Sequence, residues 1–204
     1  MGICVPYTVK ANLPSIHRLH YSTVRDTIAD GDILLFRGDP LIAVLGRSCY
    51  SHAAMVVRCK SRLLVAEVRE FYGGRLVPLS GQVRRYPGRI DVYKPDWEAY
   101  PYYNASQAAD WMIDLTSCSY GYLGILRVLA SRLPVLRWIF RPSRNDKLRS
   151  PCSPFCSWAV STAARCGGGL DPVAGLADSW TEPGDLARGG RFVYSGTLYL
   201  SRST

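Results

Sequence analysis

The sequence predicts an α+β fold for a single domain spanning residues 1–204. Short apolar runs typical of β-strands occupy the first half of the chain, segments with helical spacing of apolar residues follow, and one alternating segment closes it. Strands first, helices later and one strand last is the order of elements in α+β proteins. The composition, 48% hydrophobic and 20% charged over 204 residues, is that of one globular domain.

The strands are expected to follow an irregular N-terminal extension, residues 1–29. The turn signal Asp-Gly-Asp at residues 30–32 precedes the first apolar run, and the polar residues 60–62 connect two later runs as in a hairpin. Glycine and proline separate the remaining candidates. The expected strands are residues 33–36, 52–59, 63–68, 75–79, 89–94 and 191–200.

The helices are expected in the second half of the chain. Asn104 is a suitable N-cap for a helix that reaches residue 117. Its apolar positions repeat at helical spacing: Ala108, Trp111, Met112 and Leu115. Residues 121–141 are expected to form two short helices divided at Pro134, within a basic helical insertion at about residues 121–150.

The charge of the chain is concentrated in that insertion. Basic residues outnumber acidic ones by 25 to 16, a net charge of +9, and residues 121–150 contribute +6 through seven basic residues and one acid. Three arginines within the apolar stretch 121–140 make a membrane span unfavourable. We expect helices packed on the core; the alternative is contact of residues 121–149 with an anionic membrane surface or an acyl chain.

The N-terminus lacks the basic start and long apolar run of a signal peptide. We therefore expect a cytoplasmic protein, with a membrane-peripheral location as the alternative. Seven cysteines, an odd number, fit reduced thiols better than a disulfide framework in that setting.

Cys156 has the clearest chemical setting among these cysteines. With Ser153 as N-cap and Pro154 at the first helical position, it falls at the third position of a helix that ends at glycines 167–169. Unpaired backbone N–H groups and the helix dipole favour a thiolate there, and the same N–H groups could hold an oxyanion. The alternative is a small buried cysteine that packs the helix.

A nucleophilic cysteine needs a base, usually histidine. His17 and His20 lie in the irregular N-terminal stretch, where we expect them to be solvated. His52 opens an apolar strand and is the better candidate. Its alternative role is that of a histidine at the margin of the core, bonded to a backbone carbonyl.

Glu67 strengthens the case for His52, because it interrupts an apolar strand where a carboxylate without a partner is unfavourable. If the two strands pair so that residue numbers sum to 119 or 121, His52 and Glu67 share a face of the sheet; a sum of 120 separates them. The carboxylate could then orient the imidazole. The alternative for Glu67 is an ion pair with Arg58, Arg69 or another arginine.

An ordered set of short motifs runs through most of the chain. The motifs are GDILLF at residues 31–36, SHAAMV at 51–56, Glu67, FCSWAV at 155–160 and PGDL at 183–186. Together they resemble the circularly permuted papain-like hydrolases, the YiiX/YebB-like branch of the NlpC-type superfamily, in which the strand histidine precedes the helix cysteine. The resemblance covers about residues 30–200. It implies an antiparallel sheet or partial barrel packed against the helix that carries the cysteine.

The resemblance also implies roles for individual residues, in a bacterial or phage enzyme. Cys156 would be the nucleophile, His52 the general base and acid, and Glu67 the orienting residue, without metal or cofactor. The reaction would be hydrolysis or transfer at an amide, peptide or acyl bond, with cell-wall peptides as the expected substrate. Trp158 departs from the family, which often has Glu there. The expected substrate contacts are Tyr120, Ser51 and Ser157.

Two other functions fit the same residues. Cys49, His52, Cys152 and Cys156 are ligand types suited to structural zinc, although about a hundred residues separate the two pairs. A non-catalytic module could instead use the arginine-rich surface to bind anionic lipid or nucleic acid. No nucleic-acid-binding motif is present, so we expect no specific nucleic-acid partner.

Overall fold

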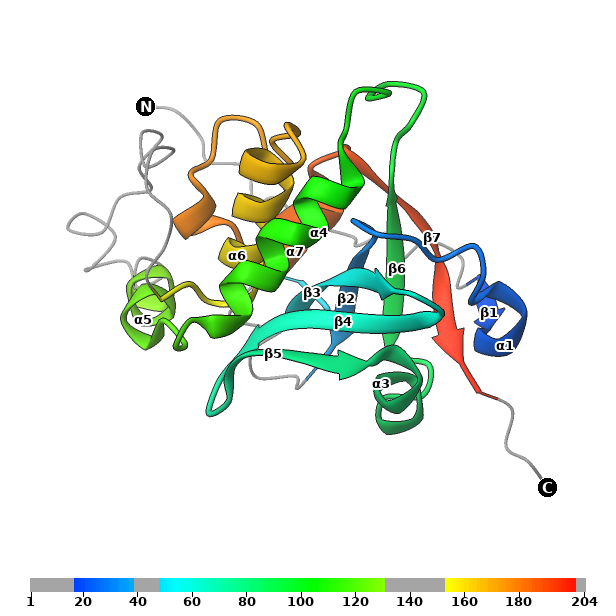
Figure 1. Ribbon diagram of the computed structural model, residues 1–204. Coiled ribbons are helices and arrows are strands. Elements are labelled where there is room, and N and C mark those ends of the chain that lie inside the picture. Colours follow the sequence, from blue (N-terminus) through cyan, green and yellow to red (C-terminus); the bar gives the residue numbers. More distant parts are fainter. Residues whose placement is uncertain (1–16, 39–47, 131–152, 201–204) are drawn as a thin grey trace, which may run out of the picture.

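The computed structural model of the chain describes residues 17–38, 48–130 and 153–200. Within these residues, helices pack on a seven-stranded sheet, which confirms the α+β class (Figure 1). The strands are β1 (Arg18–His20), β2 (Ile33–Arg37), β3 (Tyr50–Cys59), β4 (Arg62–Arg69), β5 (Gly73–Pro78), β6 (Ile90–Pro95) and β7 (Phe192–Tyr199). The α-helices are α1 (Tyr21–Val24), α3 (Leu79–Arg85), α4 (Ala105–Asp114), α5 (Tyr122–Ala130), α6 (Cys156–Thr162) and α7 (Pro183–Arg188). Shorter helical turns are η1 (Leu115–Ser117), η3 (Ala163–Gly167) and η4 (Asp178–Trp180).

The strands lie in the order β1-β7-β6-β2-β3-β4-β5. All neighbouring strands are antiparallel except β1 and β7, which are parallel. The prediction of irregular structure over residues 1–29 is wrong for residues 18–24, because β1 adds an edge to the sheet and α1 follows it. A strand of three residues is too short to give a periodic signal in the sequence.

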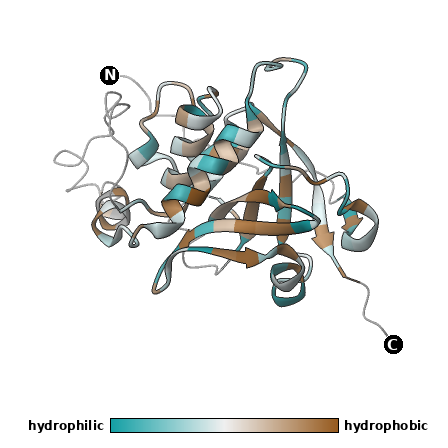
Figure 2. Ribbon diagram, in the orientation of Figure 1, coloured by the Kyte–Doolittle hydropathy of each residue, from teal (hydrophilic) through white to brown (hydrophobic). Residues whose placement is uncertain are grey.

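The sheet buries both of its faces. Helices α4, α6 and α7 cover one face, where Met55 packs in a cluster with Met112 and Ala159 (Figure 1). On the other face, Val56 shares a cluster with Leu79 of α3. Successive strand residues point to opposite faces, so a strand covered on both sides is apolar throughout. This explains the continuous apolar runs of β2, β3 and β4, and Figure 2 shows hydrophobic residues concentrated in these strands.

Helix α4 follows the prediction closely. The Asn104 side chain accepts a hydrogen bond from the Gln107 N–H at 3.1 Å, as an N-cap does. The regular helix ends at Asp114, and the predicted last turn, to residue 117, is the 3₁₀ turn η1.

Helix α6 begins later than predicted. Its N-cap is Phe155 rather than Ser153, and Cys156 is the first helical residue, not the third. The cause is tertiary packing, since the Pro154 carbonyl accepts the Gly121 N–H at 3.0 Å and the Phe155 ring is buried beside Trp158. These contacts keep Phe155 extended, and its carbonyl accepts the first helical hydrogen bond, from Ala159 at 2.9 Å.

The basic insertion is described only in part. Helix α5 confirms a helix after residue 121, whereas residues 131–152 lie outside the described residues. The strand predicted over residues 75–79 is β5, which ends at Pro78 because Leu79 starts α3. In the described part of the chain, every helix is too short or too polar to cross a bilayer.

Candidate active site

His52 and Glu67 come together through the register of β3 and β4. Met55 lies opposite Ala66, so the paired residue numbers sum to 121. Continuing that register makes His52 and Glu67 diagonal neighbours on one face of the sheet. The distance between His52 Nε2 and Glu67 Oε2 is 2.6 Å. The sum of 121 is one of the two predicted registers, 119 and 121, that bring the pair together. Because the hydrogen bond uses Nε2, Nδ1 of His52 is available to another partner.

An irregularity in β3 sets the direction of the His52 side chain. His52 pairs with Phe36 and Tyr50 pairs with Arg37, so Ser51 is an extra residue without a partner in β2. Such bulges are common beside active sites, because they redirect side chains. The Tyr50 side chain points to the opposite face of the sheet, whereas the His52 ring lies 5.2 Å from that of Phe36, between centroids.

Glu67 is fully buried and uses both carboxylate oxygens. Oε2 contacts His52, while Oε1 accepts hydrogen bonds from Arg75, which lies opposite on β5, at 2.8 Å from Nε and 2.5 Å from Nη2. Burial raises the pKa of Glu67, but His52 and then Arg75 favour the carboxylate and bring the pKa down to about 2. Both roles weighed for Glu67, histidine partner and arginine ion pair, therefore occur together.

Cys156 lies at the start of α6, where it contacts His52. The residue is a free thiol and only 4% exposed. Burial raises its pKa, yet the pKa falls below the ordinary value because of the charge and hydrogen bond of His52 and hydrogen bonds from the Ala53 and Ser157 N–H groups. Burial also lowers the pKa of His52, but Cys156 and then Glu67 raise it to about 9. Both shifts favour the thiolate of Cys156 and the imidazolium of His52.

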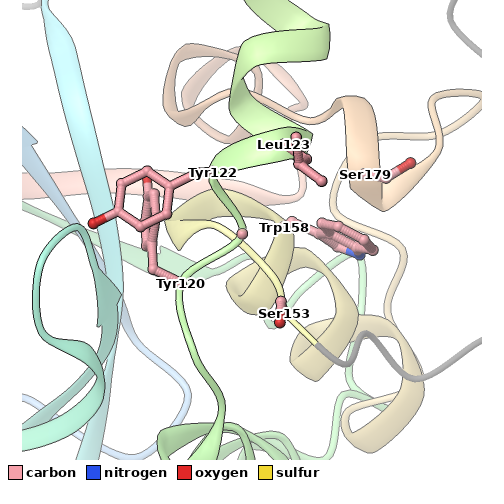
Figure 3. A pocket seen from close by; sticks show the side chains of 8 residues that line it. Tyr120, Tyr122, Leu123, Ser153, Trp158 and Ser179 are labelled. Atoms are coloured by element: carbon pink, nitrogen blue, oxygen red, sulfur yellow. The ribbon is translucent and has the colours of Figure 1, made fainter.

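A cavity of about 500 Å³ lies at the start of α5, and Trp158 of α6 is among its lining residues. Figure 3 shows Tyr120 and Tyr122 on one side of it and Trp158 and Ser179 on the other. Burial and then the negative charge of Cys156 raise the pKa of Tyr120, so its phenol stays protonated near the sulfur. The residues that line the cavity are Tyr120, Gly121, Tyr122, Leu123, Gly124, Ser153, Trp158 and Ser179.

The three expected substrate contacts differ in position. Tyr120 lines the cavity. Ser51 is half-buried and lies against Gly38, where an added Cβ would collide with the serine hydroxymethyl group. Ser157 is fully buried, and its hydroxyl donates to the Thr181 carbonyl at 2.7 Å. Only the backbone N–H of Ser157 faces the sulfur.

Sequence reasoning did not single out Arg75 or the Ala53 N–H. Arg75 is found only once the β4–β5 register is known, although the glycines at 73 and 74 signal the turn that sets it. Of the two remaining histidines, His17 is exposed and His20 is half-buried, with its ring edge-on against Tyr199, 5.3 Å away between centroids.

The zinc alternative receives no support from the described residues. Among them, Cys49, His52 and Cys156 included, no three His, Cys, Asp or Glu side chains are grouped to hold a metal ion. Cys152, the fourth candidate ligand, lies outside the described residues.

No family model and no curated protein matches the chain. Among solved structures, the chain is similar to the metalloprotein YiiX from Escherichia coli O157:H7. The TM-score is 0.48 and the sequence identity 10%, over 84% of this chain and 98% of that chain. A similarity this low does not assign a function to the site, whose chemistry follows from the described side chains.

Proposed function

We propose that the chain is a permuted papain-like cysteine hydrolase that acts on an amide, peptide or other acyl bond. The observation that carries the proposal is the contact of Cys156, at the start of α6, with His52, which is itself bonded to the buried Glu67 at 2.6 Å. A nucleophile, a base and a residue that orients the base are the three parts of a catalytic triad.

The proposed reaction has two steps. The Cys156 thiolate attacks the carbonyl carbon, and the electron pair of the C=O double bond moves to oxygen. Collapse of this intermediate breaks the bond to the leaving group, which takes a proton from the His52 imidazolium. His52, now neutral, removes a proton from water or another acceptor, whose oxygen or nitrogen attacks the thioester. The acyl product leaves, and the thiolate and imidazolium are restored.

Backbone donors near the sulfur support the intermediate in this proposal. The Ala53 and Ser157 N–H groups donate to Cys156 in the structure, and N–H groups in this position can stabilise an oxyanion. Tyr120 keeps its phenolic proton near Cys156 and can donate a further hydrogen bond to the substrate. Glu67 holds the imidazole by Nε2 and stabilises its charged form.

The cavity bears on the substrate class. Its described walls include three aromatic side chains and one leucine, and Trp158 is at the position where the resembling family often has Glu. Cell-wall peptides remain the class that the resemblance implies, and the apolar walls also suit an acyl chain. No cofactor takes part in the proposed reaction, and the single-domain organisation of residues 1–204 stays a prediction.

Site-resolved alkylation tests the proposal. Iodoacetamide labelling of Cys156, read by peptide mass spectrometry from pH 5 to pH 10, should be rapid already at pH 6 in the wild type. In His52→Ala it should be slow at pH 6 and approach the wild-type rate only at high pH, because the thiolate has lost its counterion. Cys166, exposed on the same polypeptide, is an internal control that should not respond to His52. Equal Cys156 profiles in wild type and His52→Ala would refute the proposal and favour a non-catalytic module.

A further inference from the structure

A second group of buried polar side chains, outside the proposed triad, surrounds the carboxylate of Asp91. Asp91 is fully buried, and both of its oxygens accept hydrogen bonds. Oδ2 accepts from Arg37 Nε at 2.9 Å, from Arg37 Nη2 at 2.7 Å and from the Tyr50 hydroxyl at 2.6 Å. Oδ1 accepts the Thr197 hydroxyl at 2.6 Å, and the Tyr93 hydroxyl lies 3.0 Å from that of Tyr50. We call these five residues the Asp91 network; the proposed reaction uses none of them.

The two residues that share Oδ2 of Asp91 lie beside the irregularity in β3. Arg37, at the end of β2, is the partner of Tyr50, at the start of β3. The next residue of β3 with a partner in β2 is His52, so the extra residue is Ser51. Asp91 itself belongs to β6, which pairs with β2. One carboxylate oxygen therefore holds both strands at the residue pair where the register shifts.

This shift decides which way His52 points. Side chains alternate along a regular strand, so Tyr50 and His52 would otherwise lie on the same face. Because Ser51 is inserted between them, Tyr50 packs in one core cluster and the His52 ring contacts a residue of the other. A strand that kept Tyr50 on Asp91 but lost the extra residue would turn His52 to the opposite face, since a slip of one residue exchanges the faces.

Gly38 provides the space for the extra residue. A Cβ at Gly38 would collide with the hydroxymethyl group of Ser51, so a larger residue does not fit there while Ser51 keeps its place. The irregularity thus has two supports, which are the space at Gly38 and the hydrogen bonds to Asp91.

A buried ion pair such as Arg37–Asp91 contributes little to stability, because the cost of desolvating the charges offsets much of their attraction. The best-attested use of such groups is to fix one register, since another arrangement would leave a buried charge without its partners. We propose that the Asp91 network keeps the extra residue of β3 at Ser51 and so positions the imidazole of His52 against Cys156. Asp91 is then a positioning residue, and this inference rests on the proposed hydrolase function.

Two variants remove the network in different ways. Asp91→Asn keeps the shape of the side chain but removes the charge that pairs with Arg37. Arg37→Met/Tyr50→Phe/Asp91→Leu replaces the polar groups with apolar ones of similar size, a type of exchange that often leaves stability unchanged. The matched control is Asp32→Asn, because the Asp32 carboxylate is also buried and pairs with Lys94 of β6 at 3.0 Å. That pair lies at the other end of β2, away from the register shift.

Two measurements report the position of His52. Nitrogen-15 NMR follows the titration of its imidazole, with His52→Ala to assign the signal, and peptide mass spectrometry follows iodoacetamide labelling of Cys156. In both network variants we expect the pKa of His52 to fall from about 9 towards its ordinary 6.5. Labelling of Cys156 at pH 6 should be roughly tenfold slower, because a displaced imidazole no longer stabilises the thiolate. Asp32→Asn should match the wild type in both measurements, whatever its loss of stability in urea.

Wild-type behaviour of both network variants overturns the positioning role and leaves the network a purely structural one. Equal changes in Asp91→Asn and Asp32→Asn also overturn it, because they assign the effect to a general loss of stability. Failure of the hydrolase function gives a different result. Labelling of Cys156 would then be the same in wild type and His52→Ala, while the titration of His52, which also senses Glu67, still shows whether the network holds the strand.

Discussion

Arg75 and His52 hold opposite oxygens of the same buried carboxylate. Arg75 lies opposite Glu67 on β5 and bonds Oε1, while His52 reaches Oε2 from β3. The three side chains join neighbouring strands in a single row, in which the acidic residue is the centre. Arg75 also places its guanidinium carbon 4.4 Å from the centre of the Tyr72 ring, so the row continues to the β4–β5 turn.

Glu67→Gln should destabilise the protein, because it leaves Arg75 and His52 without their anionic partner. We expect a loss of about 2–3 kcal/mol in the free energy of unfolding, measured by urea denaturation. The double variant Glu67→Gln/Arg75→Gln should recover part of that loss, since it no longer leaves the arginine unpaired. Arg188→Gln is the control, because its ion pair with Asp185 is at the surface and should contribute about 0.5 kcal/mol or less. Equal losses in the single and double variants would show that Arg75 does not depend on Glu67.

Acid should unfold the protein partly through Glu67. The folded pKa is about 2 and the ordinary value 4.5, so the carboxylate stabilises the fold above pH 4.5, and this contribution is lost as the pH falls towards 2. The full difference corresponds to about 3 kcal/mol at most. Urea midpoints between pH 2 and pH 6 should fall less steeply in Glu67→Gln than in the wild type. An unchanged slope would contradict the assignment.

Near pH 8 the two members of the catalytic pair should have opposite effects on the pH dependence of stability. Folding favours a proton on His52, because its pKa rises from 6.5 to about 9, and disfavours one on Cys156, whose pKa falls below its ordinary 9.0. The two changes have opposite signs in the number of protons bound, which is what sets the slope of stability with pH. Potentiometric measurement of proton uptake on unfolding in urea at pH 8, compared with Cys156→Ser/His52→Ala, should find a difference well below one proton. A difference of nearly one proton would mean that only one member of the pair is charged.

Tyr120→Phe should slow acyl transfer without affecting the thiolate. The variant removes the phenol near the sulfur but keeps the ring that lines the cavity. With p-nitrophenyl acetate as a generic acyl donor, we expect roughly 10²-fold slower acylation of Cys156, as for loss of one oxyanion donor. Tyr122→Phe is the matched control, because its hydroxyl accepts the Phe71 N–H and lies outside the proposed chemistry. Alkylation by iodoacetamide should be the same in all three proteins.

Phe71→Gly should stabilise the fold. Glycine adopts a φ of 66° without strain, and the lost ring is almost entirely exposed, so we expect stability to rise by about 0.5–1 kcal/mol. Urea denaturation of the two proteins measures this difference. A stability that stays unchanged or falls would show that the left-handed conformation at Phe71 costs the fold little.

The sequence was most informative where burial dominates. Strands β2, β3 and β4 are covered on both faces, so their apolar runs identify them without knowledge of their partners. Short elements such as β1, α3 and α7 have too few residues for a period to emerge. Helix α6 starts later than predicted because the position of Phe155 depends on its packing against Trp158 and on the hydrogen bond that the Gly121 N–H donates to the Pro154 carbonyl. No local sequence pattern encodes these contacts.

In the candidate site, too, some contacts could be predicted from the sequence and others depend on tertiary packing. His52 and Glu67 could be matched by counting residues across one hairpin, because a period of two leaves few registers to consider. Arg75 required the register of a second hairpin, and the meeting of Cys156 with His52 joins segments about a hundred residues apart. Ser157 shows the limit of motif reasoning, since its hydroxyl turns to Thr181 while its backbone faces the sulfur.

The unpaired Ser51 shifts the alternation of side chains in β3 by one residue, so that residues before and after it follow different registers. On the N-terminal side of Ser51, the Tyr50 hydroxyl donates to the buried Asp91 carboxylate at 2.6 Å. On its C-terminal side, the imidazole of His52 contacts the sulfur of Cys156. Removing that one serine would restore strict alternation and force one of these partnerships to break. The extra residue in β3 thus allows one strand to contribute Tyr50 to the buried hydrogen bond with Asp91 and His52 to the candidate catalytic site.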